Sequence, residues 1–241
     1  FSWSLGRVYF NDFSGRIVAS LFDGLSVKAN FGNLAVNAGA AYTGLSYKRS
    51  ANMFLDEDDA ALMSDANRYF APARLVALAG LRASELANSF DIGLDAFAQF
   101  DMESGKVSTN SQYIEPFAEG RAGRSFRYRA WMVLGLAQGQ TNAVSMAAGG
   151  RGRWSFPELA GMRATLSALW ASATTEKLSS FCPIAISTLG SVSNQSFSDV
   201  TAFQADLSVS PLSWLSMGLN LSAFMSGNLA AGSPFTGFET S

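Results

Sequence analysis

The sequence contains no histidine and only one cysteine, Cys182. Catalytic groups of the Ser-His-Asp and Cys-His types are therefore excluded, as are metal sites built from imidazoles or from several thiolates. One cysteine also excludes an internal disulfide framework. We predict that the protein is not an enzyme and holds no metal and no cofactor, with an enzyme that uses carboxylates alone as the alternative.

Charged residues and long apolar runs are scarce as well. Charged side chains make up 15% of the 241 residues, compared with about 25% in typical soluble domains, although the hydrophobic fraction is an ordinary 48%. The net charge of -2 gives no basic footprint for nucleic acid. The longest apolar runs, Leu75–Leu81 and Ala130–Ala137, are far shorter than the roughly 18 residues of a membrane helix. Any surface that faces lipid must therefore be made of strands.

What the sequence does have is a regular alternation of apolar and other residues, which is typical of strands with two different faces. The clearest apolar series is Phe90, Ile92, Leu94, Ala96, Ala98, Phe100 and Met102. The positions between them carry Asp91, Gly93, Asp95, Phe97, Gln99 and Asp101. Ten steps from 90 to 100 at about 3.3 Å, with a tilt near 40°, span about 25 Å, which matches the apolar band of an outer-membrane barrel.

The alternation recurs along the chain and predicts about twelve strands. Their ranges are 3–10, 16–22, 25–31, 34–47, 73–84, 89–102, 112–122, 126–138, 143–156, 162–174, 199–209 and 214–225. Short turns, such as Gly32-Asn33 and Gly123-Arg124, alternate with long connections at 48–72, 103–111, 175–198 and 226–241. Long loops of such barrels are extracellular, so 48–72 and 175–198 are predicted to be extracellular loops. The predicted fold class is all-β, an antiparallel up-and-down transmembrane β-barrel that forms a single domain over residues 1–241.

The two ends of the chain suggest a piece of a larger barrel. The chain opens at Phe1-Ser2-Trp3-Ser4, which already alternates like a strand, with no signal peptide before it. If the chain has about twelve strands, its first strand begins on the long-loop side and its last strand ends there. Outer-membrane barrels have both termini on the short-turn side. The segment Phe238-Glu239-Thr240-Ser241 also lacks a closing aromatic strand. We therefore expect truncation at both ends, from a barrel of about 14 or more strands.

Three segments near the N-terminus carry a resemblance to a known class of proteins. They are Gly6-Arg7-Val8-Tyr9-Phe10-Asn11-Asp12-Phe13-Ser14-Gly15, Asp23-Gly24-Leu25 and Ala41-Tyr42-Thr43-Gly44-Leu45. Together with the strand pattern, which covers nearly the whole chain, they resemble bacterial outer-membrane β-barrels, in particular a group of large, porin-like and poorly characterised ones. The resemblance implies an outer-membrane location and porin-like transport.

The predicted inner face carries most of the charge. Its acidic residues are Asp91, Asp95, Asp101, Glu115 and Glu119. Its basic residues are Arg127, Arg129, Arg151, Arg153 and Arg163, joined by Arg74 and Arg82. Facing charges of this kind set the selectivity of pores, so the first two sets are the candidate pore-lining residues. The alternative is that these acids and arginines neutralise one another across strands and that no open lumen exists.

An acidic run, Asp56-Glu57-Asp58-Asp59 with Asp65 nearby, lies in the longest internal loop. Clustered carboxylates suit a hard divalent cation, but the run lacks the spacing and the glycine of an EF-hand. We favour a short solvated helix from Asp56 to Ala66, whose acids stabilise its N-terminus.

Three functions are compatible with these predictions. The favoured one is a porin-like passive channel or transporter for small hydrophilic solutes in the bacterial outer membrane, with membrane lipid as its partner and no nucleic acid. The second is a non-conducting structural or surface-exposed barrel, a scaffold or adhesin that works through its long loops. The third is a soluble β-sandwich or jelly roll, which the strand length and low charge disfavour.

Overall fold

The computed structural model describes all residues except 46, 49–52, 54–56, 87–88, 104–109, 140–141, 186–187, 190–194, 213, 228–234 and 241. The large sheet consists of β1 (Ser2–Asn11), β2 (Ala19–Phe31), β3 (Leu34–Tyr42), β4 (Arg74–Leu86), β5 (Phe90–Asp101), β6 (Asn110–Ala122), β7 (Phe126–Gln138), β8 (Ala143–Phe156), β9 (Met162–Ala171), β12 (Val200–Leu212), β13 (Leu215–Met225) and β14 (Phe235–Thr240). The remaining elements are the short strands β10 (Thr188–Leu189) and β11 (Gln195–Ser196), the 3-10 helix η1 (Thr43–Leu45) and the helix α1 (Glu57–Ser64).

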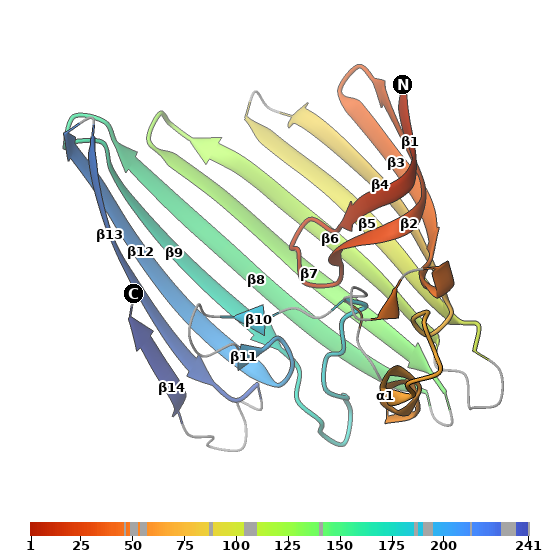
Figure 1. Ribbon diagram of the computed structural model, residues 1–241. Helices are drawn as coiled ribbons and strands as arrows, with labels where there is room; N and C mark the ends of the chain where they lie inside the picture. Colours follow the sequence, from red (N-terminus) through yellow and green to blue (C-terminus); the bar gives the residue numbers. More distant parts are fainter. Residues whose placement is uncertain are drawn as a thin grey trace.

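The fold is all-β, with one twelve-stranded antiparallel sheet in which every strand pairs with the next one along the chain, β9 with β12 included. This confirms the predicted up-and-down class. Figure 1 shows the long strands lying side by side, with β1 and β2 turning across one face of them. No pairing within the described ranges joins β1 to β14, so the hydrogen bonds do not close the sheet. Among the described residues, no helix has the length and apolar character needed to cross a membrane.

The two faces of the sheet differ as the alternation predicted. In β5, the apolar Ile92 and Leu94 are exposed at 41% and 43%, while Phe97 and Gln99, on the opposite face, are 4% and 6% exposed. The same parity holds in the neighbouring strands. The exposed outer face includes Leu34, Leu75, Leu81, Phe100, Ile114, Met132, Leu134, Leu136, Leu166, Phe203, Leu207, Met217 and Leu219. The outer face is therefore apolar, and the inner face carries the charges.

The two ends of the sheet also differ, as predicted. Short turns at 32–33, 123–125 and 157–161 define the short-turn end, and longer connections such as the one between β3 and β4 and the one between β9 and β12 define the long-loop end. Gly32 and Gly123 have φ of 59° and 67°, a left-handed conformation that glycine adopts without steric cost, which is why tight turns form there.

One predicted boundary is wrong, because 16–22 and 25–31 are not two strands. They form the single strand β2, which pairs with β1 without interruption from Lys28 opposite Ser2 to Ala19 opposite Asn11. The sequence Asp23-Gly24 lies within this strand and forms no turn. A Cβ at Gly24 would lie 2.2 Å from the carbonyl oxygen of Ala40, so only glycine permits this close crossing.

Strand ends differ elsewhere too. The strand predicted over 34–47 ends at Tyr42, where η1 begins, and the one over 162–174 ends at Ala171. The strand β14 lies within 226–241, which was predicted as a loop. With two predicted strands merged and one added, β1 begins at the short-turn end and β14 runs towards it. The first and last strands therefore do not have the orientation that the expectation of additional strands assumed, and the total number of strands stays a prediction.

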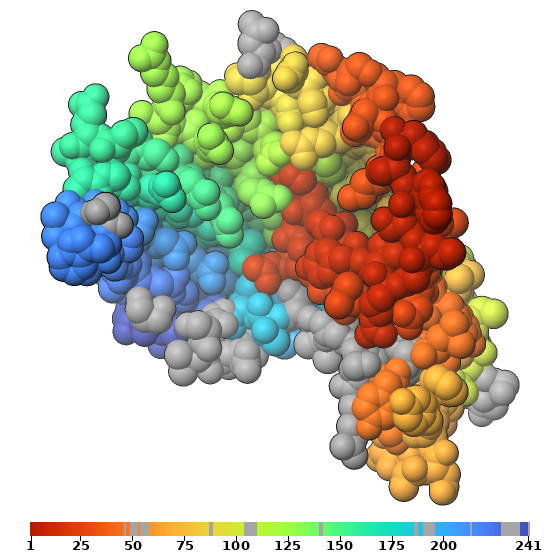
Figure 2. Space-filling model, turned by 45° about the horizontal axis from the view of Figure 1, so that its top comes forward, coloured from red at the N-terminus to blue at the C-terminus, as the bar shows by residue number. Residues whose placement is uncertain are grey.

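The inner face is covered by two segments of the chain itself. The tip of the β1–β2 hairpin folds onto it, and so do residues 178–185, which follow β9. Figure 2 shows the N-terminal hairpin lying over the hollow of the sheet. The fully buried aromatic residues of this core are Phe10, Phe181, Phe197 and Phe224. The apolar core therefore lies inside the curved sheet and towards its long-loop end.

Candidate functional site

The hairpin tip, residues 12–18, is shaped by one buried carboxylate. Asp12 is 2% exposed, and its two oxygens accept hydrogen bonds from the backbone N–H groups of Arg16 at 3.0 Å, Ile17 at 3.1 Å and Val18 at 2.7 Å. The Ser14 hydroxyl also donates to Asp12. These bonds satisfy the backbone of a loop that would otherwise bury unpaired donors.

The tip is docked onto β5 and β6 by two carboxylates that the sequence predicted as pore-lining. The N–H of Phe13 donates to Asp95 at 3.2 Å and to Glu115 at 3.0 Å, and the N–H of Ser14 donates to Glu115 at 3.0 Å. Glu115 is fully buried beneath the tip. Asp95 and Glu115 therefore lie on the predicted face, but they hold the tip in place.

Aromatic and cationic contacts complete the docking. The ring of Phe13 stacks on Phe117 with centroids 3.9 Å apart and planes 6° apart. The guanidinium of Arg129 lies over the ring of Phe13, with its Cζ 4.1 Å from the ring centroid. Arg129 also donates a hydrogen bond to the Phe13 carbonyl at 2.6 Å. Such stacked and cation–π contacts favour one defined position of the ring.

A second inward segment, residues 178–185, packs against the tip. The N–H groups of Ile184 and Ala185 donate to the Ile17 carbonyl at 2.9 and 3.1 Å. Phe181 packs edge-to-face on Phe197, with centroids 5.5 Å apart. We call the tip (residues 12–18) and residues 178–185 together the interior plug. The plug occupies the inner face next to the long-loop end.

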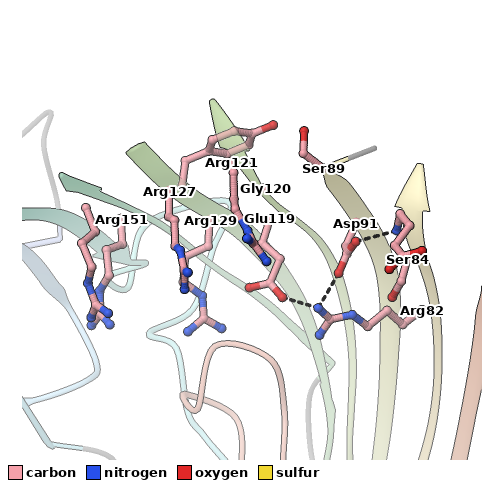
Figure 3. A pocket seen from close by; sticks show the side chains of 13 residues that line it. Arg82, Ser84, Ser89, Asp91, Glu119, Gly120, Arg121, Arg127, Arg129 and Arg151 are labelled. Carbon is pink, nitrogen blue, oxygen red and sulfur yellow. Dashed lines mark hydrogen bonds and ion pairs between the residues drawn. The ribbon is translucent and has the colours of Figure 1, made fainter. Parts of the chain in front are cut away.

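At the short-turn end the inner face stays polar and open, with a cavity of about 660 Å³. Its cationic lining consists of Arg82, Arg121, Arg127, Arg129, Arg151 and Arg153. Its carboxylates are Glu85, Asp91 and Glu119. Figure 3 shows the side chains of Arg127, Arg129 and Arg151 directed to the same side of the sheet, and Glu119 turned towards Arg82.

The charges of this cavity are unevenly paired. Arg82 makes ion pairs with both Asp91, at 2.6 Å, and Glu119. The arginines of β7 and β8 instead face one another, because Arg127 lies opposite Arg153 and Arg129 opposite Arg151 in the strand register. The cavity therefore combines a neutralised acidic side with a basic side.

Of the ten candidate pore-lining residues, six meet in this cavity. They are Asp91, Glu119, Arg127, Arg129, Arg151 and Arg153. The other four lie elsewhere: Asp95 and Glu115 under the tip, Asp101 buried at the long-loop end opposite Arg74, and Arg163 exposed at the start of β9 outside the cavity lining. Whether any of them lines a pore stays a prediction.

The acidic loop has a structural role in the described part. The predicted helix is present as α1, although Asp56 lies outside the described residues. Asp59 is buried and forms an ion pair with the buried Arg74. In the same region Arg68 pairs with Glu103 at 2.6 Å, and this hydrogen bond raises the pKa of Arg68. Within the described ranges, no group of three or more carboxylate or cysteine side chains is placed to hold a metal ion.

Sequence reasoning missed the plug. Its only local signals are the turn-forming residues Asp12, Ser14 and Gly15 between two apolar strands, and they do not indicate where the tip docks. Comparison with known proteins adds no identification, since no protein-family model matches this chain and no curated protein matches it significantly. The fold therefore defines the class, an all-β up-and-down sheet, and the function has to be argued from the site.

Proposed function

We propose that this chain is a bacterial outer-membrane β-barrel that passes small hydrophilic solutes by a route that its interior plug restricts. The observation that carries the proposal is the placement of exposed apolar side chains on the outer face and of charged side chains on the inner face. A water-soluble sheet protein distributes the two classes the other way round. Apolar side chains are stable on an outer face that is in contact with lipid.

Strand length supports a membrane location. The strands β5, β7 and β8 contain 12, 13 and 14 residues. Thirteen residues at about 3.3 Å and a tilt near 40° reach about 30 Å, enough to cross an apolar band of about 25 Å. Strands of soluble proteins are usually about five or six residues long.

Exposed aromatic residues at both ends support the same location. Phe31 and Trp214 are exposed at the short-turn end, and Tyr42 and Phe100 are exposed at the long-loop end. Aromatic side chains gather at both interfaces of membrane barrels, because their rings combine an apolar body with a polar or polarisable edge.

The cavity and the plug suggest how passage is controlled. The polar cavity can hold water and a hydrophilic solute, whereas the plug fills the inner face near the long-loop end. A solute that crosses the whole barrel must therefore displace the plug or pass it. A permanently occupied interior would instead favour the second candidate, a non-conducting structural barrel, and the apolar packing of Phe181 and Phe197 is the observation in its favour.

Two measurements test the proposal. The purified full chain should require detergent to stay in solution and should change its gel mobility on boiling, as closed membrane barrels do. In planar bilayers it should then give discrete conductance steps. The structural barrel would be favoured if the folded protein changes its gel mobility on boiling but never conducts, and if liposomes that contain it remain impermeable to small solutes. A chain that stays monodisperse without detergent would contradict the membrane location itself.

A further inference from the structure

The basic side of the cavity carries more positive charge than the chain's own carboxylates neutralise. Six arginines line the cavity, compared with three carboxylates. Two of these carboxylates, Asp91 and Glu119, are already engaged by Arg82. In the described part of the chain, no carboxylate makes an ion pair with Arg127 or Arg153. The surplus positive charge is therefore concentrated on β7 and β8.

The strand register brings these like charges close together, which is unfavourable. Arg127 lies directly opposite Arg153 on one side and Arg121 on the other, and Arg129 lies opposite Arg151. Side chains directly opposite each other in an antiparallel pair are only about 5 Å apart at Cβ, and like charges at such positions destabilise a sheet. A sheet that gathers arginines in this way gains stability when an anion binds between them.

Contacts with neighbouring residues fix the orientation of two of these side chains. The Nε of Arg151 donates to the Ser167 hydroxyl at 3.3 Å, which orients its guanidinium. The guanidinium of Arg129 is held by the ring and the carbonyl of Phe13, and its buried Nε has no hydrogen-bond partner among the described residues. A planar guanidinium binds oxyanions through two parallel N–H bonds, so fixed orientation favours phosphate-like and carboxylate ligands over simple halides.

We infer that this cavity binds a small, soluble, multivalent oxyanion between Arg127, Arg129, Arg151 and Arg153. The chemical class is that of phosphates, phosphate monoesters and polycarboxylates. The inference rests on the proposed function in one respect, since it names the class of solute that the route would carry. Binding itself requires only the folded cavity and can be measured without any passage across a membrane.

Pyrophosphate is titrated into the full, folded chain in detergent micelles at low ionic strength, and its binding is measured by isothermal titration calorimetry. The test variant is R127Q/R153Q, and the matched control is R163Q, which removes the same kind of charge from the same face outside the cavity lining. We expect saturable binding of one pyrophosphate, weakened about tenfold or more in R127Q/R153Q and changed less than about twofold in R163Q. Glucose, which is uncharged, should not bind.

Several results would overturn the inference. The first is that the parent chain does not bind pyrophosphate. The second is that R127Q/R153Q binds pyrophosphate as tightly as the parent chain does. The third is that R163Q loses as much affinity as R127Q/R153Q, which would show that the effect comes from diffuse charge. If R127Q/R153Q fails to fold, R127K/R153K keeps the charge and loses the paired N–H geometry, so it should still bind more weakly than the parent. Pyrophosphate binding without conductance would contradict the proposed channel and support the anion site. Conductance without pyrophosphate binding would support the channel and contradict the anion site.

Discussion

The docking of the hairpin tip can be tested by replacing Phe13 with alanine. The ring of Phe13 stacks on Phe117 at 3.9 Å and lies under Arg129 at 4.1 Å. An aromatic pair contributes about 0.5–1.5 kcal/mol and a cation–π contact about 0.5–2 kcal/mol, and the partly buried ring adds apolar burial. Together these contributions predict that the variant weakens docking by about 3 kcal/mol. That free energy corresponds to a change of about a hundredfold in the ratio of undocked to docked tips.

Hydrogen–deuterium exchange measures this ratio directly. The N–H groups of Phe13 and Ser14 donate to Asp95 and Glu115 only while the tip is docked, so their exchange reports undocking. In F13A the amide of Ser14 and that of residue 13 should exchange about a hundredfold faster, when exchange is limited by the opening equilibrium. The amide of Val18 should change less, because it donates to Asp12 within the tip itself.

A matched control separates docking from a general loss of stability. Phe31 is 66% exposed on the outer face, so F31A removes the same ring without touching the plug and should leave the tip amides protected. Unchanged exchange at residues 13 and 14 in F13A would refute the proposed docking energetics. Equal acceleration in F31A would show that the tip merely follows global unfolding.

Three further predictions concern the sheet and use unfolding by denaturant in detergent or lipid. If the outer face meets lipid as proposed, Leu94→Arg should destabilise the protein by about 2–4 kcal/mol, more than Leu94→Ala does, and equal effects would argue against a lipid-facing position. Gly24→Ala should lower stability by at least about 1–3 kcal/mol because its Cβ would clash at 2.2 Å, whereas Gly218→Ala, whose nearest contact is 3.8 Å, should be almost neutral. Arg74→Gln should cost about 3–5 kcal/mol by leaving the buried Asp59 without its cation, and a cost below about 1 kcal/mol would contradict the buried pair.

The faces of the sheet could be predicted from the sequence because they depend only on local geometry. A strand alternates its side chains with a period of two, so the apolar series through Leu94 and Phe100 determined which residues lie outside. The opposite series, with Asp91 and Asp95, lies inside as predicted. No information about distant parts of the chain was needed for this assignment.

The hairpin could not be predicted in the same way, because its geometry depends on other strands. A glycine in an alternating run is compatible with a turn, a bulge or a bend. At Gly24 the choice is decided by the close approach of the Ala40 carbonyl and by the unbroken pairing with β1. The docking of Phe13 likewise depends on Glu115, which is about a hundred residues away in the chain.

The role of each charged residue depends on what folds over it, which the face alone does not reveal. Glu115 and Glu119 lie four positions apart on one face of β6, yet Glu115 is fully buried and binds the tip, whereas Glu119 pairs with Arg82 in the open cavity. Arg129 belongs to both environments, since it lines the cavity and donates to the Phe13 carbonyl. An oxyanion that binds Arg129 competes with that carbonyl for the same guanidinium. Occupation of the cavity and release of the tip are therefore expected to be coupled, with each favouring the other.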